Sequence, residues 1–91
     1  MKITKKVQEK YFKAILEGEK TYEVRLADFE CKPGDVLVLL EQKDGTRELT
    51  GRKMECEISM VFNTKDMEKF HSKNEIEKYG LLVMAIKKKE I

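Results

Sequence analysis

The sequence predicts one small α+β domain in which a mixed, strongly bent sheet of about five to six strands closes into a barrel. Strand-like stretches recur along the chain, whereas only one main stretch, at about residues 8–17, has helical spacing. A shorter helical piece is expected before the last strand. Most connections are too short for a parallel crossover, apart from the one through the main helix. Closure into a barrel would also remove exposed strand edges.

The composition limits the domain count and the class of protein. The 91 residues fit a single domain over residues 1–91, of which 41% are hydrophobic and 40% are charged. The 19 basic and 17 acidic residues leave a net charge of only +2. This balance excludes a protein that holds nucleic acid by overall charge alone, so any such binding must come from local placement of Lys and Arg.

The cysteines and the apolar runs indicate a compartment. Cys31 and Cys56 lack zinc-ligand spacing, and no apolar run approaches the ~20 residues that span a bilayer. We therefore expect a monomeric cytoplasmic protein with reduced cysteines, no membrane association, no metal and no cofactor. Cys56 is expected to be a small core residue. Cys31 has no histidine neighbour that could activate it as a nucleophile.

The first half of the chain predicts strand, helix and strand in that order. Residues 3–7 are a plausible first strand, and residues 8–17 repeat apolar side chains at helical steps until Gly18, a helix-ending residue. Residues 21–26 alternate as a half-buried strand does, with Tyr22, Val24 and Leu26 on one face. Phe12 and Tyr22 are expected in the core.

The second half predicts three more strands and a short helix. An apolar strand covers residues 36–40, and an Asp-Gly hairpin turn at residues 43–46 leads into a returning strand from about Arg47 to Val61. Gly51 is expected to mark a bulge in that strand. Inward positions of the strand are predicted at Met54, Cys56, Ile58 and Met60. Capping-box spacing at residues 72–75 predicts a short helix that ends at Gly80, and residues 81–86 form the final strand.

Polar side chains gather where the helix meets the second strand. Thr21, Glu23 and Arg25 share one strand face, so a hydroxyl, a carboxylate and a guanidinium stand in a row suited to a planar polar ligand. Lys20 joins them only if it belongs to a turn after Gly18, which we predict. The alternative is an exposed strand face with an ordinary surface ion pair, worth about 0–1 kcal/mol.

Several other residues are candidates for the same site. Lys5 and Arg52 are expected to add a basic rim for phosphates, and Tyr11 is expected to form a cleft wall, with Tyr79 as the alternative. His71 lies in a polar stretch and is expected at the surface without a catalytic role. The alternative for the basic residues is a solvated helix face, because acidic residues are interleaved with them.

Gly18, Lys20, Glu23 and Arg25 match the G-x-K-x-x-E-x-R motif of ASCH domains. The chain also resembles this family around the motif, with an amphipathic helix before it and a Pro-Gly-Asp turn and apolar strand after it. The resemblance covers most of residues 3–61 and 81–86, and it is to a compact, little-characterised prokaryotic and phage branch. ASCH domains belong to the PUA-like superfamily.

The resemblance implies a pseudo-barrel with a cleft beside the helix, lined by the motif, that binds RNA or a nucleotide. One enzymatic branch of the family hydrolyses acetylated cytidine with the lysine that matches Lys20 and a threonine where this chain has Glu23. Glu23 lacks that hydroxyl, which favours binding over catalysis. The alternatives are a small hydrolase acting on a modified nucleoside, with Lys20 and Glu23 as catalytic residues, and a protein-interaction domain with no catalysis.

Overall fold

The fold is a curled five-stranded mixed sheet with two helices, seen in a computed structural model that describes residues 1–63 and 74–89. The elements follow one another in the order β1 (Lys2–Gln8), α1 (Glu9–Leu16), β2 (Tyr22–Leu26), β3 (Val36–Gln42), β4 (Leu49–Asn63), α2 (Asn74–Tyr79) and β5 (Leu81–Lys88).

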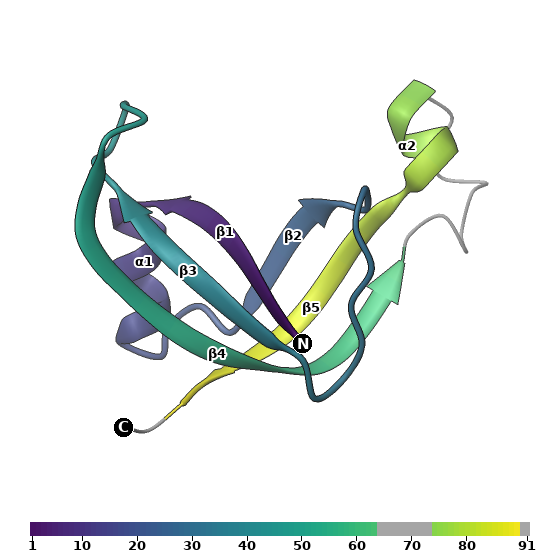
Figure 1. The fold of residues 1–91 in the computed structure, drawn as a ribbon, viewed down its shortest axis with the longest axis horizontal. Coiled ribbons are helices and arrows are strands. Elements are labelled where there is room, and N and C mark those ends of the chain that lie inside the picture. The colour runs from purple at the N-terminus through teal and green to yellow at the C-terminus, as the bar shows by residue number, and fades with distance from the viewer. Residues whose placement is uncertain (64–73, 90–91) are drawn as a thin grey trace.

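The strand order across the sheet is β1-β3-β4-β5-β2, so the second strand of the chain lies at the edge opposite the first. Only β1 and β3 are parallel, and the other three pairs are antiparallel. In Figure 1, β4 runs as one long curve, with β1 and β3 on one arm and β5 and β2 on the other. The sheet therefore forms a half-barrel whose two edge strands, β1 and β2, are not hydrogen-bonded to each other in the ladder.

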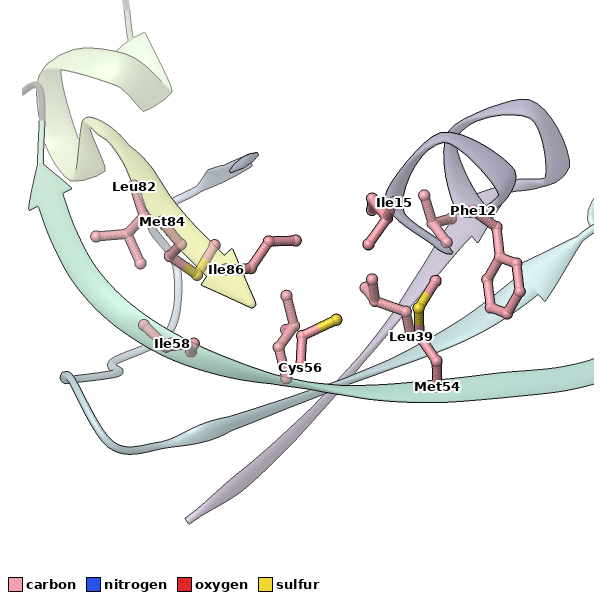
Figure 2. Close-up of a cluster of buried hydrophobic side chains, with 11 residues drawn as sticks. Phe12, Ile15, Leu39, Met54, Cys56, Ile58, Leu82, Met84 and Ile86 are labelled. Atoms are coloured by element: carbon pink, nitrogen blue, oxygen red, sulfur yellow. The ribbon is translucent and has the colours of Figure 1, made fainter. Parts of the chain in front are cut away.

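The hydrophobic core fills the concave side of this half-barrel. Figure 2 shows side chains of α1 above Leu39 and Met54 on one arm, and side chains of β5 above Ile58 on the other, with Cys56 between the two groups. The buried members come from α1 and from all the strands except β2: Val7, Phe12, Ile15, Leu37, Leu39, Met54, Cys56, Ile58, Leu82, Met84 and Ile86.

Helix α1 follows β1 directly and ends in a tight turn. Phe12 and Ile15 are its buried residues, and the rest of its surface is mostly exposed. Gly18 adopts φ +81°, which glycine tolerates because it has no Cβ, and its N–H donates to the Ile15 carbonyl at 3.1 Å. The helix is thus held by two apolar anchors and stopped where the site begins.

Most sequence expectations about the elements are confirmed. The main helix lies within the predicted range, and the short helix stands directly before Gly80 and the last strand. Gly51, at φ +96°, lies in the part of β4 where the pairing with β3 shifts register, as a bulge requires. Cys31 and Cys56 are both free, and Cys56 is fully buried.

Two expectations about facing direction are wrong. Tyr22 is 52% exposed, because the inner face of β2 belongs to Glu23 rather than to the apolar residues. Met60 is 64% exposed, because the pairing of β4 with β5 gains an extra residue between Ile58 and Met60. That bulge at Ser59 reverses the side-chain alternation, so Met60 joins the outer face.

Because Tyr22 and Met60 face outward, apolar side chains form rows across the outer face of the arm that holds β5 and β2. Tyr22 pairs with Ala85, which pairs with Met60. Val24 pairs in the same way with Val83 and then Phe62. Directly paired residues share a sheet face, so both rows point outward.

Part of the sequence analysis falls outside the described residues. This holds for His71, for the first half of the capping box and for every other position between 64 and 73. Among the residues that are described, no helix is long and apolar enough to cross a membrane.

A cleft between the two edge strands

The turn after α1 brings Lys20 to the edge of β2. The N–H groups of Glu19 and Lys20 both donate to the Ala14 carbonyl, at 2.9 and 3.1 Å. These bonds wrap the chain around the end of the helix before strand geometry begins at Tyr22. The prediction that Lys20 belongs to a turn after Gly18 is confirmed. Because of this turn, the Lys20 side chain reaches Tyr22 and Glu23.

Glu23 lies between two cations. The Lys20 Nζ lies 2.5 Å from Glu23 Oε1, and the Arg25 Nε donates to Glu23 Oε2 at 2.9 Å. Lys20 also donates to the Tyr22 carbonyl at 2.7 Å, and Arg25 Nη2 to the Lys6 carbonyl of β1 at 2.7 Å. Each side chain is thus fixed by two bonds, and Arg25 links the two edge strands.

The cluster is buried at its carboxylate and open at its cations. The side chain of Glu23 is 5% exposed, against 15% for Lys20 and 26% for Arg25. Both oxygens of Glu23 are already bonded, so its role in this state is to position the two cations. Arg25 has five N–H donors and uses two of them on the described residues, which leaves donors for a ligand.

The Cys56 thiol lies below this cluster in the core. Burial, reinforced by the negative charge of Glu23, raises the pKa of Cys56 to about 11. Burial and the Asp35 charge also raise the pKa of Cys31. A raised pKa keeps each thiol protonated, so neither cysteine has the character of a reactive thiolate.

A cleft of about 410 Å³ opens over the cluster, between β1 and β2. This volume is in the usual range for small-ligand sites. Tyr11 and Tyr22 stand beside Lys20, whose Nζ is 5.8 and 4.8 Å from their ring centroids. The cleft is lined by Lys6, Val7, Gln8, Tyr11, Lys20, Tyr22, Glu23, Val24, Arg25 and Gln42.

Four of the predicted site residues come together at this cleft: Lys20, Glu23, Arg25 and Tyr11. The other three lie elsewhere. Thr21 lines a separate hollow at the end of α1, and the Lys5 ammonium lies 4.0 Å from the centroid of Phe29. The sequence analysis missed Gln8 and Gln42, whose amides form a hydrogen bond at 3.2 Å beside the cleft. Nothing in the sequence pattern pairs them, because they meet only through the parallel register of β1 and β3.

Arg52 is engaged in a different buried ion pair. Its Nε and Nη2 donate to the two oxygens of Glu41 at 2.9 and 2.7 Å, and Thr50 donates to the same carboxylate. Glu41 is 1% exposed, and the bonds from Arg52 hold its pKa below the ordinary value. Arg52 thus neutralises a buried charge next to the β4 bulge and does not line the cleft.

A second hollow, of about 480 Å³, lies around the loop that joins β2 and β3. Its buried charged group is Asp35, whose oxygens accept from the Met1 ammonium at 3.1 Å and the Lys32 backbone N–H at 2.9 Å. These contacts lower the pKa of Asp35, with the Lys32 bond as the main cause. Asp35 therefore serves to hold the loop, and the cleft with the three converging charges is the better candidate site.

The described residues include no group of three or more His, Cys, Asp or Glu side chains that could hold a metal ion. The charged groups of the cleft are instead two cations and one carboxylate. That set can bind an anionic or polar planar group through Arg25 and Lys20.

Comparison with known families places this chain. A family model described as a domain of unknown function, DUF3850, matches residues 4–75. The chain belongs to the DUF3850 family. The match includes the whole cleft, from β1 through Gln42.

One curated relative comes from a phage. The chain is 41% identical over 61 residues to an uncharacterised 12.9 kDa protein in the GpA 3′ region of Escherichia phage P2. The matched segment covers 67% of this chain and 54% of the phage protein, so the chain spans about half the length of that relative.

Two solved structures share the fold of this DUF3850 member. The crystal structure of hypothetical protein PH0355 aligns with a TM-score of 0.68 at 21% identity, over 98% of this chain and 100% of that one. The solution structure of protein PF0455 from Pyrococcus furiosus aligns with a TM-score of 0.55 at 18% identity, over 100% of both chains.

Proposed function

We propose that this protein binds RNA or a nucleotide in the cleft between β1 and β2. The observation that carries the proposal is the convergence of Lys20, Glu23 and Arg25 at the floor of that cleft, where both cations keep exposed surface. One buried carboxylate holds two cations in fixed positions, so little side-chain entropy remains to be lost when they bind a ligand.

Two further observations support a nucleic-acid ligand. Tyr11 and Tyr22 are half exposed and line the same cleft, where they offer aromatic faces for stacking on bases. The motif Gly18, Lys20, Glu23 and Arg25 and the half-barrel also agree with the resemblance to ASCH domains of the PUA-like superfamily, and we include membership of that superfamily in the proposal.

Replacing Arg25 with alanine should weaken RNA binding about tenfold or more. The ligand loses a charge-assisted contact, and Glu23 keeps only one of the two cations that it holds in place. The measurement is a fluorescence titration of short single-stranded RNAs at several salt concentrations. Arg47→Ala is the matched control, since Arg47 is exposed in the hairpin loop and is not among the residues that line the cleft. Equal affinities for the wild type and the folded Arg25→Ala protein would contradict the proposal.

A hydrolase acting on a modified nucleoside is the second candidate, and one contact favours it. The ion pair between the Lys20 ammonium and Glu23 puts a potential proton donor beside a potential acceptor at the cleft floor. Incubation with acylated nucleosides should then give turnover that Lys20→Ala abolishes and Lys53→Ala leaves intact. Lys53 is an exposed lysine on β4 outside the cleft. Absence of turnover across a broad panel would exclude this candidate.

The remaining alternative, a protein-interaction domain with an inert cleft, would be favoured by motif side chains that lie far apart in solvent. Lys20, Glu23 and Arg25 are instead in direct contact. We therefore rank this alternative below the two ligand-based ones.

A further inference from the structure

The open edge of β2 directs specific backbone groups into the cleft. The Thr21 carbonyl accepts from the Ile86 N–H at 3.0 Å, and the Ala27 N–H donates to the Gly80 carbonyl at 3.1 Å, so these residues bond toward β5. Bonding direction alternates along an antiparallel strand. The N–H and C=O groups of Tyr22 and Val24 therefore point away from β5, toward β1.

The facing edge of β1 is fixed in the same way. The Met1 carbonyl accepts from the Val36 N–H of β3 at 2.9 Å, which puts the odd-numbered residues toward β3. Lys6 is an even-numbered residue, so its backbone groups point away from β3. Its carbonyl is the one that accepts from Arg25. The cleft is thus bordered by two free strand edges.

The motif cations occupy two of the carbonyls on these edges. Lys20 donates to the Tyr22 carbonyl, and Arg25 donates to the Lys6 carbonyl. Between these blocked positions, Val24 keeps its N–H and its C=O without a hydrogen-bond partner in residues 1–63 and 74–89. A donor and an acceptor of one residue therefore point side by side into the cleft.

We propose that the backbone N–H and C=O of Val24 read the hydrogen-bonding edge of a single nucleobase. Every nucleobase carries an adjacent donor and acceptor on its Watson–Crick edge, which complements one residue of an open strand. The cleft walls next to Val24 include Tyr11 and Tyr22, so the base would meet aromatic surface as well as the backbone. This inference rests on the proposed function and adds the group that is recognised.

A single heterocycle fits this edge better than an extended peptide. Strand addition needs a run of free backbone groups along an edge. Here the Tyr22 and Lys6 carbonyls are taken, and the Arg25 side chain crosses from β2 to β1. With these two carbonyls occupied and Arg25 bridging the gap, the free N–H and C=O of Val24 suit a small planar ligand.

The ligand side of the test uses nucleosides and analogues with a blocked edge. Calorimetric titrations use adenosine, guanosine, cytidine and uridine. They are repeated with analogues whose hydrogen-bonding edge is blocked: adenosine or cytidine dimethylated on the exocyclic amine, 1-methylguanosine and 3-methyluridine. The blocked analogue of a nucleoside that binds should lose about tenfold or more in affinity, because one hydrogen bond is lost and its partner is left buried. Analogues changed on the opposite edge, such as 5-methyluridine and 5-methylcytidine, are the controls and should bind like their parents.

The protein side of the test removes the donor alone. Val24→Pro deletes the N–H at an edge position where no ladder bond is lost, and it should weaken nucleoside binding about tenfold. The matched control is Thr4→Pro, which deletes an N–H on the open edge of β1 outside the cleft lining and should bind nucleosides as the wild type does. The backbone amide resonance of Val24 should also shift on titration of the wild-type protein, a readout that requires no variant.

The outcomes separate this inference from the proposed function. Equal binding of edge-blocked and parent nucleosides, displacement of the nucleoside by ribose 5-phosphate with equal affinity, or tight binding of an extended peptide in its place would overturn the base-reading role. RNA binding that depends on Arg25 without any nucleoside binding would overturn it as well, while the proposed function would stand. Absence of binding to both RNA and nucleosides would overturn both.

Discussion

Replacing Phe12 with alanine should lower the free energy of unfolding by about 3–5 kcal/mol. Phe12 is 2% exposed and is one of the two residues by which α1 is buried against the sheet. At roughly 0.05–0.15 kcal/mol per residue, a chain of 91 residues has a total stability of the order of 5–14 kcal/mol. The substitution should therefore remove a large share of the stability. Urea unfolding followed by far-ultraviolet circular dichroism measures it.

Tyr11 provides a control on the same turn of the helix. It is 45% exposed, so Tyr11→Ala should change the free energy of unfolding by less than about 1 kcal/mol while it removes one wall of the cleft. A Phe12→Ala protein that is as stable as Tyr11→Ala would show that α1 is not anchored through the core. The pair also separates loss of fold from loss of ligand binding, because only Tyr11 lines the cleft.

The order of the elements could be predicted because it depends on local patterns. The repeat of Tyr11, Phe12 and Ile15 at helical steps needs no knowledge of distant residues, and the glycine after them marks where the helix stops. Lys20 was included through the motif resemblance and a predicted turn at Gly18, because strict strand alternation would have placed it on the opposite face, and this turn brings it onto Glu23. Alternation likewise put Glu23 and Arg25 on one face.

Which face of β2 is buried could not be predicted from alternation. Period 2 separates two faces but does not say which one turns inward, and hydrophobicity favoured Tyr22 and Val24. The tertiary structure reverses that assignment, because the inner face of this edge strand carries the ion cluster at the cleft floor. The bulge at Ser59 is a second long-range effect, since it exists only in the register of β4 against β5.

The partner of Arg52 was also beyond local reasoning. Arg52 looked like a free cation for phosphates, while Glu41 stood at the end of an apolar strand without any evident role. Their contact depends on the irregular pairing of β3 with β4 around Gly51. The one sequence signal that pointed to this contact was Gly51, which marked the bulge but did not identify Glu41 and Arg52 as partners.

Replacing Arg52 with alanine should lower the melting temperature by roughly 10 °C at pH 7. The substitution leaves the Glu41 carboxylate, which is 1% exposed, with a hydroxyl from Thr50 as its remaining partner. The Arg52 guanidinium also lies 5.0 Å from the Phe12 ring, so some packing is lost with the charge. Thermal unfolding followed by circular dichroism measures the shift.

The pH dependence identifies the unpaired charge as the cause. In the wild type, Arg52 holds the pKa of Glu41 below its ordinary value of 4.5, so this contribution to stability is complete above that value and is lost as the pH falls through the lowered pKa. Without Arg52, burial acts to raise the pKa of the same carboxyl. The gap in melting temperature between wild type and Arg52→Ala should therefore narrow between pH 7 and pH 4, as the carboxyl of the variant takes up a proton.

A double-variant cycle completes the argument. Glu41→Gln removes the charge and keeps the shape, and the double variant Arg52→Ala with Glu41→Gln should recover most of the melting temperature lost by Arg52→Ala alone. A double variant no more stable than Arg52→Ala would mean that the packing of Arg52 on Phe12, rather than the buried charge, dominates the effect. Arg52 is then a structural cation in either case, and among the cations predicted for the site, Lys20 and Arg25 are the ones that line the cleft between β1 and β2.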